Sequence, residues 1–146
     1  MTKGIAVFIT TLSLLVSLTT QAENNPTTLS KKVSKCAGVF KQVYERAKTN
    51  CYSDYQHCSN ANNLSTMYNG LLKQAKQLHR LDKVEEQKGY EIAQTISDAS
   101  MVQAAVHSEG DYYKLVEKCM NYASAAKKLI NNKIKAKHGN NAIDDF

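Results

Sequence analysis

The stretch from Leu64 to Leu81 is LSTMYNGLLKQAKQLHRL, and it decides the fold class. Its apolar side chains recur at steps of three and four residues, which places them on one face of an α-helix. They are Leu64, Met67, Tyr68, Leu71, Leu72, Ala75, Leu78 and Leu81. No proline occurs between residues 27 and 146, so no proline interrupts a long helix there. The pattern predicts an amphipathic helix that packs against other helices.

A similar stripe precedes this segment. From about Leu29 to Asn50, it consists of Leu29, Val33, Cys36, Phe40, Val43 and Ala47. Ser30 or Thr28 is available as its N-cap. The polar residues from Asn50 to Asn63, with two cysteines among them, predict a connection between the two helices.

Two more helices are predicted beyond Leu81. The first runs from about Lys83 to His107 with the stripe Ile92, Ile96, Ala99, Met101, Val102 and Val106, and its Ala and Ser residues suggest close packing. Ser108-Glu109-Gly110-Asp111 then supplies a stop for this helix and a cap for the second one. Its stripe is Tyr112, Leu115, Val116, Cys119, Ala123, Ala126, Ile130 and Ile134.

Strand patterns of alternating β-branched residues do not occur in the sequence. The four amphipathic segments therefore predict an all-α fold, a small antiparallel four-helix bundle with two disulfides. We expect a leader at residues 1–22, the helical domain at 23–139 and a flexible C-terminal tail at 140–146.

The leader is predicted to be a cleavable signal peptide. One cation, Lys3, precedes an uncharged run from Gly4 to Thr20, and Thr20-Gln21-Ala22 matches a cleavage site before the polar residues that follow. The alternative is a membrane anchor, but the run is short for a span and contains six Thr and Ser residues. We expect cleavage after Ala22, a periplasmic or secreted mature protein, and no stable membrane insertion afterwards.

Four cysteines, Cys36, Cys51, Cys58 and Cys119, follow the leader. An even number in an exported chain indicates two disulfides. We favour Cys36–Cys119 with Cys51–Cys58, and the second bridge requires a turn because helical geometry would hold its sulfurs apart. Cys51–Cys119 with Cys36–Cys58 stays open. A zinc site is disfavoured by the spacing of the cysteines.

Other residues that carry chemistry do not form a recognisable motif. His57, His79, His107 and His138 lack metal-ligand spacing, and we interpret each as a surface or loop residue. The pair Glu85-Glu86 after Asp82 is typical of a solvated first helical turn. The sequence therefore predicts no catalytic residue, no metal ligand and no cofactor.

Lysines are densest near the end of the last helix, at Lys127, Lys128, Lys133, Lys135 and Lys137. They could hold an anionic partner, such as a lipid headgroup or an acidic protein, but their spread around the axis favours an exposed helix end. The whole chain has 19 Lys and Arg against 13 Asp and Glu, a net charge of +6. DNA is not an expected partner outside the cytoplasm, so no nucleic-acid partner is predicted.

Four tyrosines form the candidate binding surface. Tyr52 and Tyr55 lie within the Cys51 to Cys58 segment, and Tyr112 and Tyr113 open the last helix, at the same end of an antiparallel bundle. Tyrosine is common at recognition surfaces, although packing of the bundle end explains these residues slightly better.

We therefore expect a protein, not an enzyme, that binds another macromolecule, a protein in the cell envelope or outside the cell, as an inhibitor, immunity or accessory protein. The alternative is a carrier of a small ligand or metal in the bundle interior.

Overall fold

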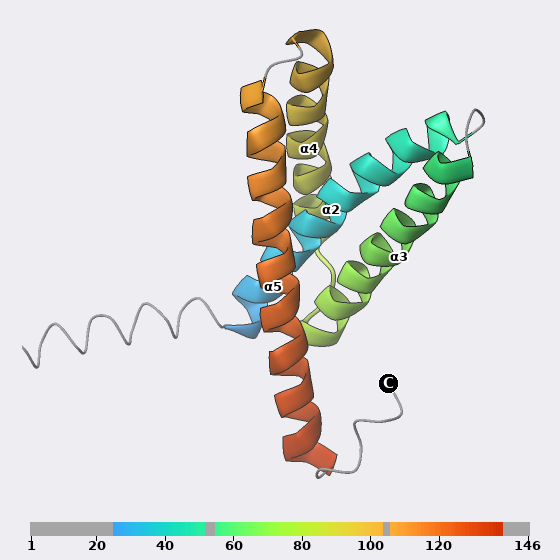
Figure 1. Cartoon of the computed structure of the whole chain (residues 1–146). Helices are drawn as coiled ribbons and strands as arrows, with labels where there is room; N and C mark the ends of the chain where they lie inside the picture. Colours follow the sequence, from blue (N-terminus) through green and yellow to red (C-terminus); the bar gives the residue numbers. More distant parts are fainter. Residues whose placement is uncertain (1–24, 52–54, 104–105, 139–146) are drawn as a thin grey trace, which may run out of the picture.

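The computed structural model describes residues 25–51, 55–103 and 106–138. They form four helices, α2 (Pro26–Asn50), α3 (Tyr55–Leu78), α4 (Lys83–Gln103) and α5 (Val106–His138), as Figure 1 shows. The predicted all-α fold with four helices is confirmed. The predicted leader, residues 1–22, and the tail, residues 140–146, lie outside the described residues.

Both disulfides have the pairing that the sequence favoured. Cys36 of α2 is bonded to Cys119 of α5, with 5.4 Å between their Cα atoms. Cys51 is bonded to Cys58, with 4.6 Å between their Cα atoms. The second bridge is possible because α2 ends at Asn50 and α3 begins at Tyr55, so that one continuous helix does not hold the two cysteines apart.

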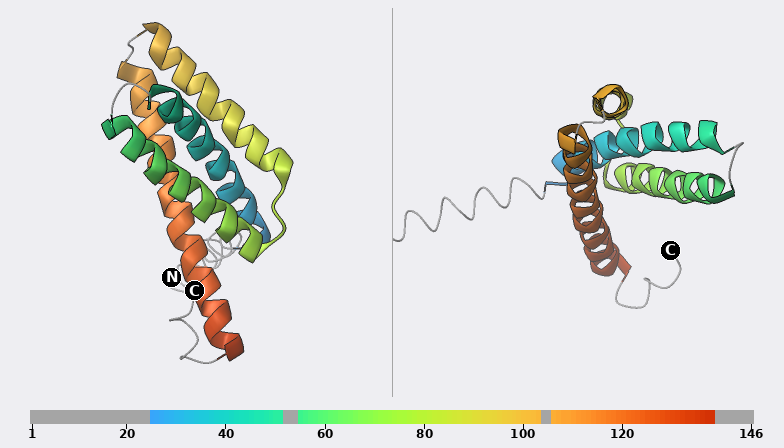
Figure 2. Two further views of the ribbon diagram at one scale, coloured as in Figure 1. Left: turned by 90° about the vertical axis from the view of Figure 1, so that its right-hand side faces the viewer. Right: turned by 45° about the horizontal axis from the view of Figure 1, so that its top comes forward.

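Consecutive helices reverse direction, but a regular antiparallel bundle is not confirmed. In Figure 1, the α2–α3 pair leans away from the α4–α5 pair, and the two pairs spread apart toward one end. Helix α2 contacts the other three helices, and it is the centre of the fold. The C-terminal part of α5 extends beyond the other helices, which both Figure 1 and Figure 2 show.

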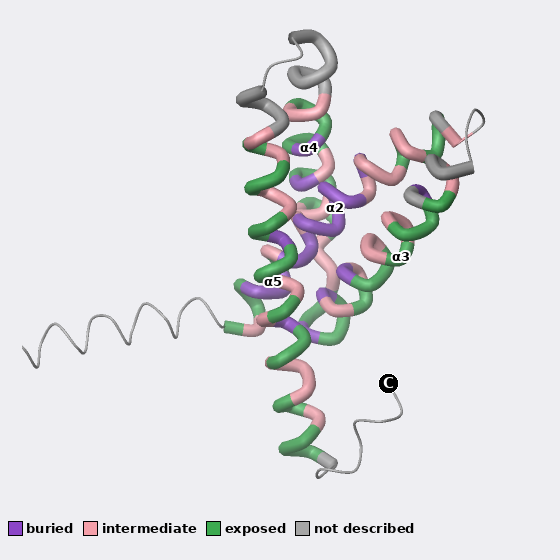
Figure 3. Tube along the Cα trace, viewed as in Figure 1, coloured by how far each residue is buried: buried purple, intermediate pink, exposed green. Residues whose placement is uncertain are grey.

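The core follows α2. Figure 3 shows that buried residues gather along this helix and where its neighbours meet it. Val33 and Ala37 of α2 are fully buried, as are Ala75 of α3, Ala93 of α4 and Cys119 of α5. Much of this core consists of small side chains, which allow the helix backbones to approach closely.

The start of α2 differs from the prediction. Asn25, and not Ser30 or Thr28, is the N-cap, because its Oδ1 accepts a 2.9 Å hydrogen bond from the backbone N–H of Thr27. Pro26 occupies the first helical turn, where its missing N–H costs nothing. Ser30 lies buried inside the helix and donates a 3.0 Å hydrogen bond to the carbonyl oxygen of Ala75 on α3.

Helix α3 begins nine residues earlier than expected. The segment from Asn50 to Asn63 was predicted to be a connection, but α3 starts at Tyr55. The inward stripe continues upstream of Leu64 through Ala61, which is buried, while Asn62 and Asn63 face solvent. A single small apolar residue thus continues the stripe that its polar neighbours obscure.

The predicted break near Leu81 is present, but α3 ends three residues earlier than expected, at Leu78, and α4 begins at Lys83. The predicted boundary between the last two helices was wrong. Helix α4 ends at Gln103 instead of His107, and α5 begins at Val106. Gly110 therefore lies within α5 and is not a stop. A long helix can include one glycine, which costs about 1 kcal/mol relative to alanine.

The buried face of α4 is also rotated relative to the predicted stripe. Ile92 was expected in the core, but it is 42% exposed, and Ala93 is buried instead. The cause is a close approach of α2 and α4, in which a Cβ on Gly38 would meet the carbonyl oxygen of Glu86. A Cβ on Gly89 would in turn meet the backbone of Lys35. The face of α4 with the smallest residues therefore packs on α2, as its Ala and Ser content suggested.

Candidate functional site

An open groove lies over the Cys36–Cys119 disulfide, between α2, α4 and α5. Its volume is about 190 Å³. We call it the disulfide groove, and its lining residues are Lys32, Lys35, Cys36, Val39, Gly89, Ile92, Leu115, Lys118, Cys119 and Tyr122. Apolar side chains from three helices therefore surround the Cys36–Cys119 disulfide.

The sequence positions this groove through small residues and a covalent bond. Because Gly38 and Gly89 lack side chains, α4 lies directly against α2, and the neighbouring Ile92 is left at the edge of the groove. The Cys36–Cys119 bond then holds α5 beside α2. Both cysteines are buried, at 3% and 0% exposure, so the disulfide forms the base of the groove and not its rim.

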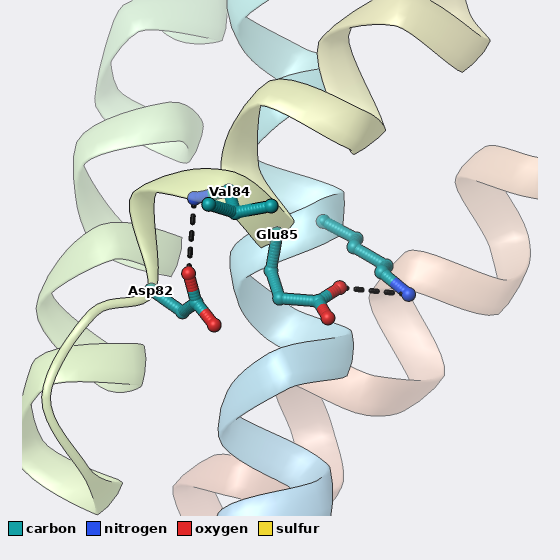
Figure 4. Close-up of polar contacts among 4 residues, drawn as sticks. Asp82, Val84 and Glu85 are labelled. Carbon is teal, nitrogen blue, oxygen red and sulfur yellow. Dashed lines mark hydrogen bonds and ion pairs between the residues drawn. The ribbon is translucent and has the colours of Figure 1, made fainter.

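The rim of the disulfide groove is cationic. Lys32 on α2 places its Nζ 4.9 Å from the centre of the Tyr122 ring on α5, a distance suited to a cation–π contact. Lys35 on α2 forms an ion pair with Glu85, with 2.7 Å between Nζ and Oε2 (Figure 4). Lys118 on α5 is exposed. The groove thus combines an apolar floor with amines contributed by two helices.

Figure 4 shows how the start of α4 is fixed beside this rim. Asp82 Oδ1 accepts a 3.0 Å hydrogen bond from the backbone N–H of Val84, which is an N-cap contact. Glu85 reaches across to α2, and the carboxylate of Glu86 accepts a 3.0 Å hydrogen bond from the hydroxyl of Tyr68 on α3. The acidic pair was interpreted as solvated, and this was wrong: both carboxylates join α4 to its neighbours.

Tyr68 and Glu86 form a polar cluster with Lys41 of α2, whose Nζ lies 3.9 Å from the same Glu86 oxygen. Burial, the hydrogen bond to Glu86 and the negative charges of Glu86 and Glu45 together raise the pKa of Tyr68 to about 12. The neutral phenol is therefore the form that the fold favours. This cluster connects three helices through side chains.

The tyrosines of the predicted binding surface are only partly described. Tyr112 is half-buried and Tyr113 is 63% exposed, and their ring centroids are 6.4 Å apart in an edge-on arrangement. Burial and the charge of Tyr113 raise the pKa of Tyr112 and the charge of Arg46 lowers it, and the net result is a pKa of about 12. Tyr52 and the side chain of Tyr55 lie outside the described residues, so the proposed surface stays a prediction.

Among the histidines, only His79 has a described side chain. It is exposed, and its Nε2 lies 2.8 Å from the hydroxyl oxygen of Thr27, so this contact joins the end of α3 to the start of α2. The side chains of His57, His107 and His138 lie outside the described residues. Within residues 25–51, 55–103 and 106–138, no group of three or more His, Cys, Asp or Glu side chains is arranged to hold a metal ion.

The lysine cluster lies on the C-terminal half of α5 (Figure 1). All five lysines, Lys127, Lys128, Lys133, Lys135 and Lys137, are exposed. As far as the described residues extend, none of the helices is both long and apolar enough to cross a membrane.

The sequence prediction missed the disulfide groove and its lysines. Lys32, Lys35 and Lys118 belong to helices that are far apart in the sequence, and no local motif joins them. One signal was present: Gly38 and Gly89 lie inside helical segments, where glycine is unfavourable unless backbones meet. Pairing these two glycines would have identified the α2–α4 contact and the edge of the groove.

Comparison with family models, with curated proteins and with solved structures finds no match for this chain.

Proposed function

We propose that this chain is an exported helical protein that binds another macromolecule, and that the disulfide groove receives an acidic segment with apolar side chains from a protein partner. One observation carries the proposal. An apolar floor lies between amines on two helices, Lys32 and Lys35 on α2 and Lys118 on α5. Ile92, large and 42% exposed at the edge, adds apolar area for a partner.

The rigidity of the groove supports a binding role. Its base is a buried disulfide, and its α2–α4 wall is a backbone contact between glycines. A surface that is held in one shape loses little conformational entropy when a partner binds. A small disulfide-linked helical scaffold therefore suits an inhibitor, immunity or accessory protein.

The positive charge of the rim favours a partner segment that carries carboxylates. Of the three rim amines, that of Lys118 is exposed and attracts carboxylates during the encounter, whereas Lys35 is already paired with Glu85. The net charge of +6 for the whole chain, which becomes +5 when Lys3 is removed with the leader, acts in the same direction over longer distances. We expect the attraction to weaken as salt concentration rises, because these amines are close to solvent.

Export is the other part of the proposal. It is supported by the sequence pattern of residues 1–22 and by two disulfides, which are compatible with an oxidising compartment. The mature chain is proposed to act in the periplasm or outside the cell, without stable membrane insertion and without a nucleic-acid partner.

A carrier of a small ligand or metal is the runner-up function. Pockets for drug-sized ligands usually have volumes of about 300 to 1,000 Å³ and enclose most of the ligand. The disulfide groove is smaller, at about 190 Å³, and open to solvent. Its shape therefore favours a protruding segment of a macromolecule over an enclosed ligand. The proposed role is binding, and no enzymatic role is proposed.

Charge reversal at the rim tests the proposal. The mature chain, immobilised as wild type, Lys118→Glu and Lys128→Glu, is exposed to the envelope and medium fractions of its source cell, and retained proteins are identified by mass spectrometry. Lys128 is the matched control because it is an exposed lysine of the same helix outside the disulfide groove.

We expect a protein that wild type and Lys128→Glu retain and that Lys118→Glu binds roughly tenfold more weakly, a loss of about 1.4 kcal/mol. The proposal is contradicted if all three baits retain the same proteins equally, or if none retains a specific partner.

A further inference from the structure

A second groove lies between α3 and α5, beside the part of α5 that extends beyond the other helices. Its volume is about 270 Å³, and we call it the α3–α5 groove. Ile130 and Ile134 of α5 line it together with Gly70 of α3. A Cβ on Gly70 would meet no atom within 4 Å, so the groove is open at this point.

The α3–α5 groove is cationic on both sides. Lys73 of α3 and Lys127 of α5 belong to its lining. Helix α3 has no acidic residue in its sequence, and α5 has none after Glu117, although six lysines follow. The groove therefore has the chemistry to bind an acidic segment that also carries apolar side chains.

The chain itself contains such a segment directly after α5. Residues 139–146 are Gly-Asn-Asn-Ala-Ile-Asp-Asp-Phe. Asp144 and Asp145 are the only acidic residues after Glu117, and Ile143 and Phe146 flank them. The order apolar, acidic, acidic, apolar complements isoleucines that lie between two lysines. We infer that residues 139–146 fold back and dock in the α3–α5 groove instead of extending freely into solvent.

The lengths agree with this docking. Along a helix, Ile134 lies about 6 Å and Lys127 about 17 Å before His138, where α5 ends. Eight extended residues span at most about 26 Å. The disulfide groove is out of comfortable reach, because Tyr122 lies about 24 Å before the end of α5. Gly139 can adopt the backbone conformation that reverses the chain after a helix.

Covalent connection makes even weak pairing effective. A segment on a short tether meets its site at a millimolar effective concentration. The apolar contacts of Ile143 and Phe146 add to the ion pairs of the two aspartates. Docking does not depend on the proposed partner of the disulfide groove, because the two grooves share no lining residue.

Zero-length cross-linking of the mature chain with a carbodiimide tests this docking, since it joins carboxylates only to amines in direct contact. Lys128 and Lys135 are the control amines: both are exposed on the same part of α5 but lie outside the α3–α5 groove. We expect intramolecular links from Asp144 and Asp145 to Lys73 and Lys127 at least about fivefold more often than to the two controls, as tethered docking at one site requires. Equal linkage to all four lysines overturns the inference, and so do links found only between two copies of the chain.

A second measurement does not depend on cross-linking. We compare amide chemical shifts of the wild type with the Asp144→Lys and Asp145→Lys double variant, and use Asp111→Lys near the other end of α5 as the control. Docking predicts shifts at Gly70 and Lys73 of α3, which are far from the substitutions in sequence, and none there in the control. Shifts confined to the residues next to the substitutions contradict the docking.

Discussion

At the scale of single residues, the contact between Gly38 and Gly89 determines how closely α2 and α4 approach. A Cβ at either position would meet the backbone of the opposite helix, where rotation of a side chain cannot relieve the overlap. The pair therefore sets the position of α4, and with it one wall of the disulfide groove.

We predict that Gly89→Ala lowers the free energy of unfolding by about 3 kcal/mol, the upper end of the usual cost of overpacking, because the helices must separate. Gly70→Ala is the matched control, since a Cβ there meets nothing, and we expect it to stabilise the exposed helix by about 0.5 to 1 kcal/mol. Guanidinium denaturation followed by circular dichroism measures both. Equal effects of the two substitutions would show that α2 and α4 do not meet at Gly89.

Tyr68 gives the fold a dependence on alkaline pH. Its pKa is raised to about 12 in the folded chain from an ordinary value near 10, so the folded state retains the phenol proton more strongly than the unfolded state. The stabilisation is complete below pH 10 and is lost as the pH rises from about 10 through about 12. Loss of the proton also removes the hydrogen bond that Tyr68 donates to Glu86.

Denaturation midpoints measured between pH 8 and pH 12 test this link. We expect Tyr68→Phe to flatten part of the decline above pH 10, whereas Tyr113→Phe changes the decline only through Tyr112, whose pKa the charge of Tyr113 helps to raise. Tyr112, whose pKa is also raised to about 12, contributes to the decline that remains. An identical decline in all three proteins would count against the Tyr68–Glu86 contact.

At the scale of helices, apolar periodicity predicted four elements and most of the faces that pack, but the boundaries depended on subtler signals. The stripes of α2 and α3 were recognisable because Leu, Val and Phe mark them. The first turns of α3 were missed because Ala61 alone marks its buried face there. On α4 the larger residue, Ile92, was assigned to the core, although backbone contact requires the smaller Gly89 and Ala93 to face α2.

Asp82 precedes the first residue of α4, and replacing its side chain tests whether it acts as the N-cap of this helix. We predict that Asp82→Ala lowers the free energy of unfolding by about 1 kcal/mol, because the N–H of Val84 loses its acceptor. Asp111→Ala is the control: Asp111 is exposed inside α5, and its ion pair with Lys114, at 3.9 Å, is a surface contact worth about 0.5 kcal/mol or less. Urea denaturation distinguishes the two, and a loss for Asp82→Ala no larger than the control would exclude the cap.

At the scale of the whole molecule, the two disulfides have different roles. Cys36–Cys119 joins residues 83 positions apart and connects the central helix to the last one. Cys51–Cys58 joins residues 7 positions apart at the α2–α3 turn. The sequence favoured this pairing but left Cys51–Cys119 with Cys36–Cys58 open, and the structure decides between them. It could not predict the groove over the long-range bridge, because that groove depends on how three helices cross.

The two disulfides close loops of different length, and this predicts that they contribute unequally to the stability of the fold. In the chain-entropy model, replacing Cys36 and Cys119 by alanine lowers the free energy of unfolding by about 4.5 kcal/mol. Replacing Cys51 and Cys58 lowers it by about 2.5 kcal/mol. Denaturation of the two double variants under the same buffer conditions measures the difference. If the Cys51/Cys58 variant were the less stable of the two, the long-range bridge would not be the main covalent constraint on the fold.

The most direct test of the central claim places a photo-crosslinking amino acid at Ile92, at the edge of the disulfide groove, and in a second protein at Val84, which is 74% exposed on the same helix outside the groove. Each mature protein is irradiated in its own envelope or medium fraction. We predict one cross-linked partner from position 92, strongly reduced by Lys118→Glu, and none of that partner from position 84. Equal capture at both positions, or capture at 92 that Lys118→Glu leaves unchanged, would contradict the assignment of the disulfide groove as the binding site.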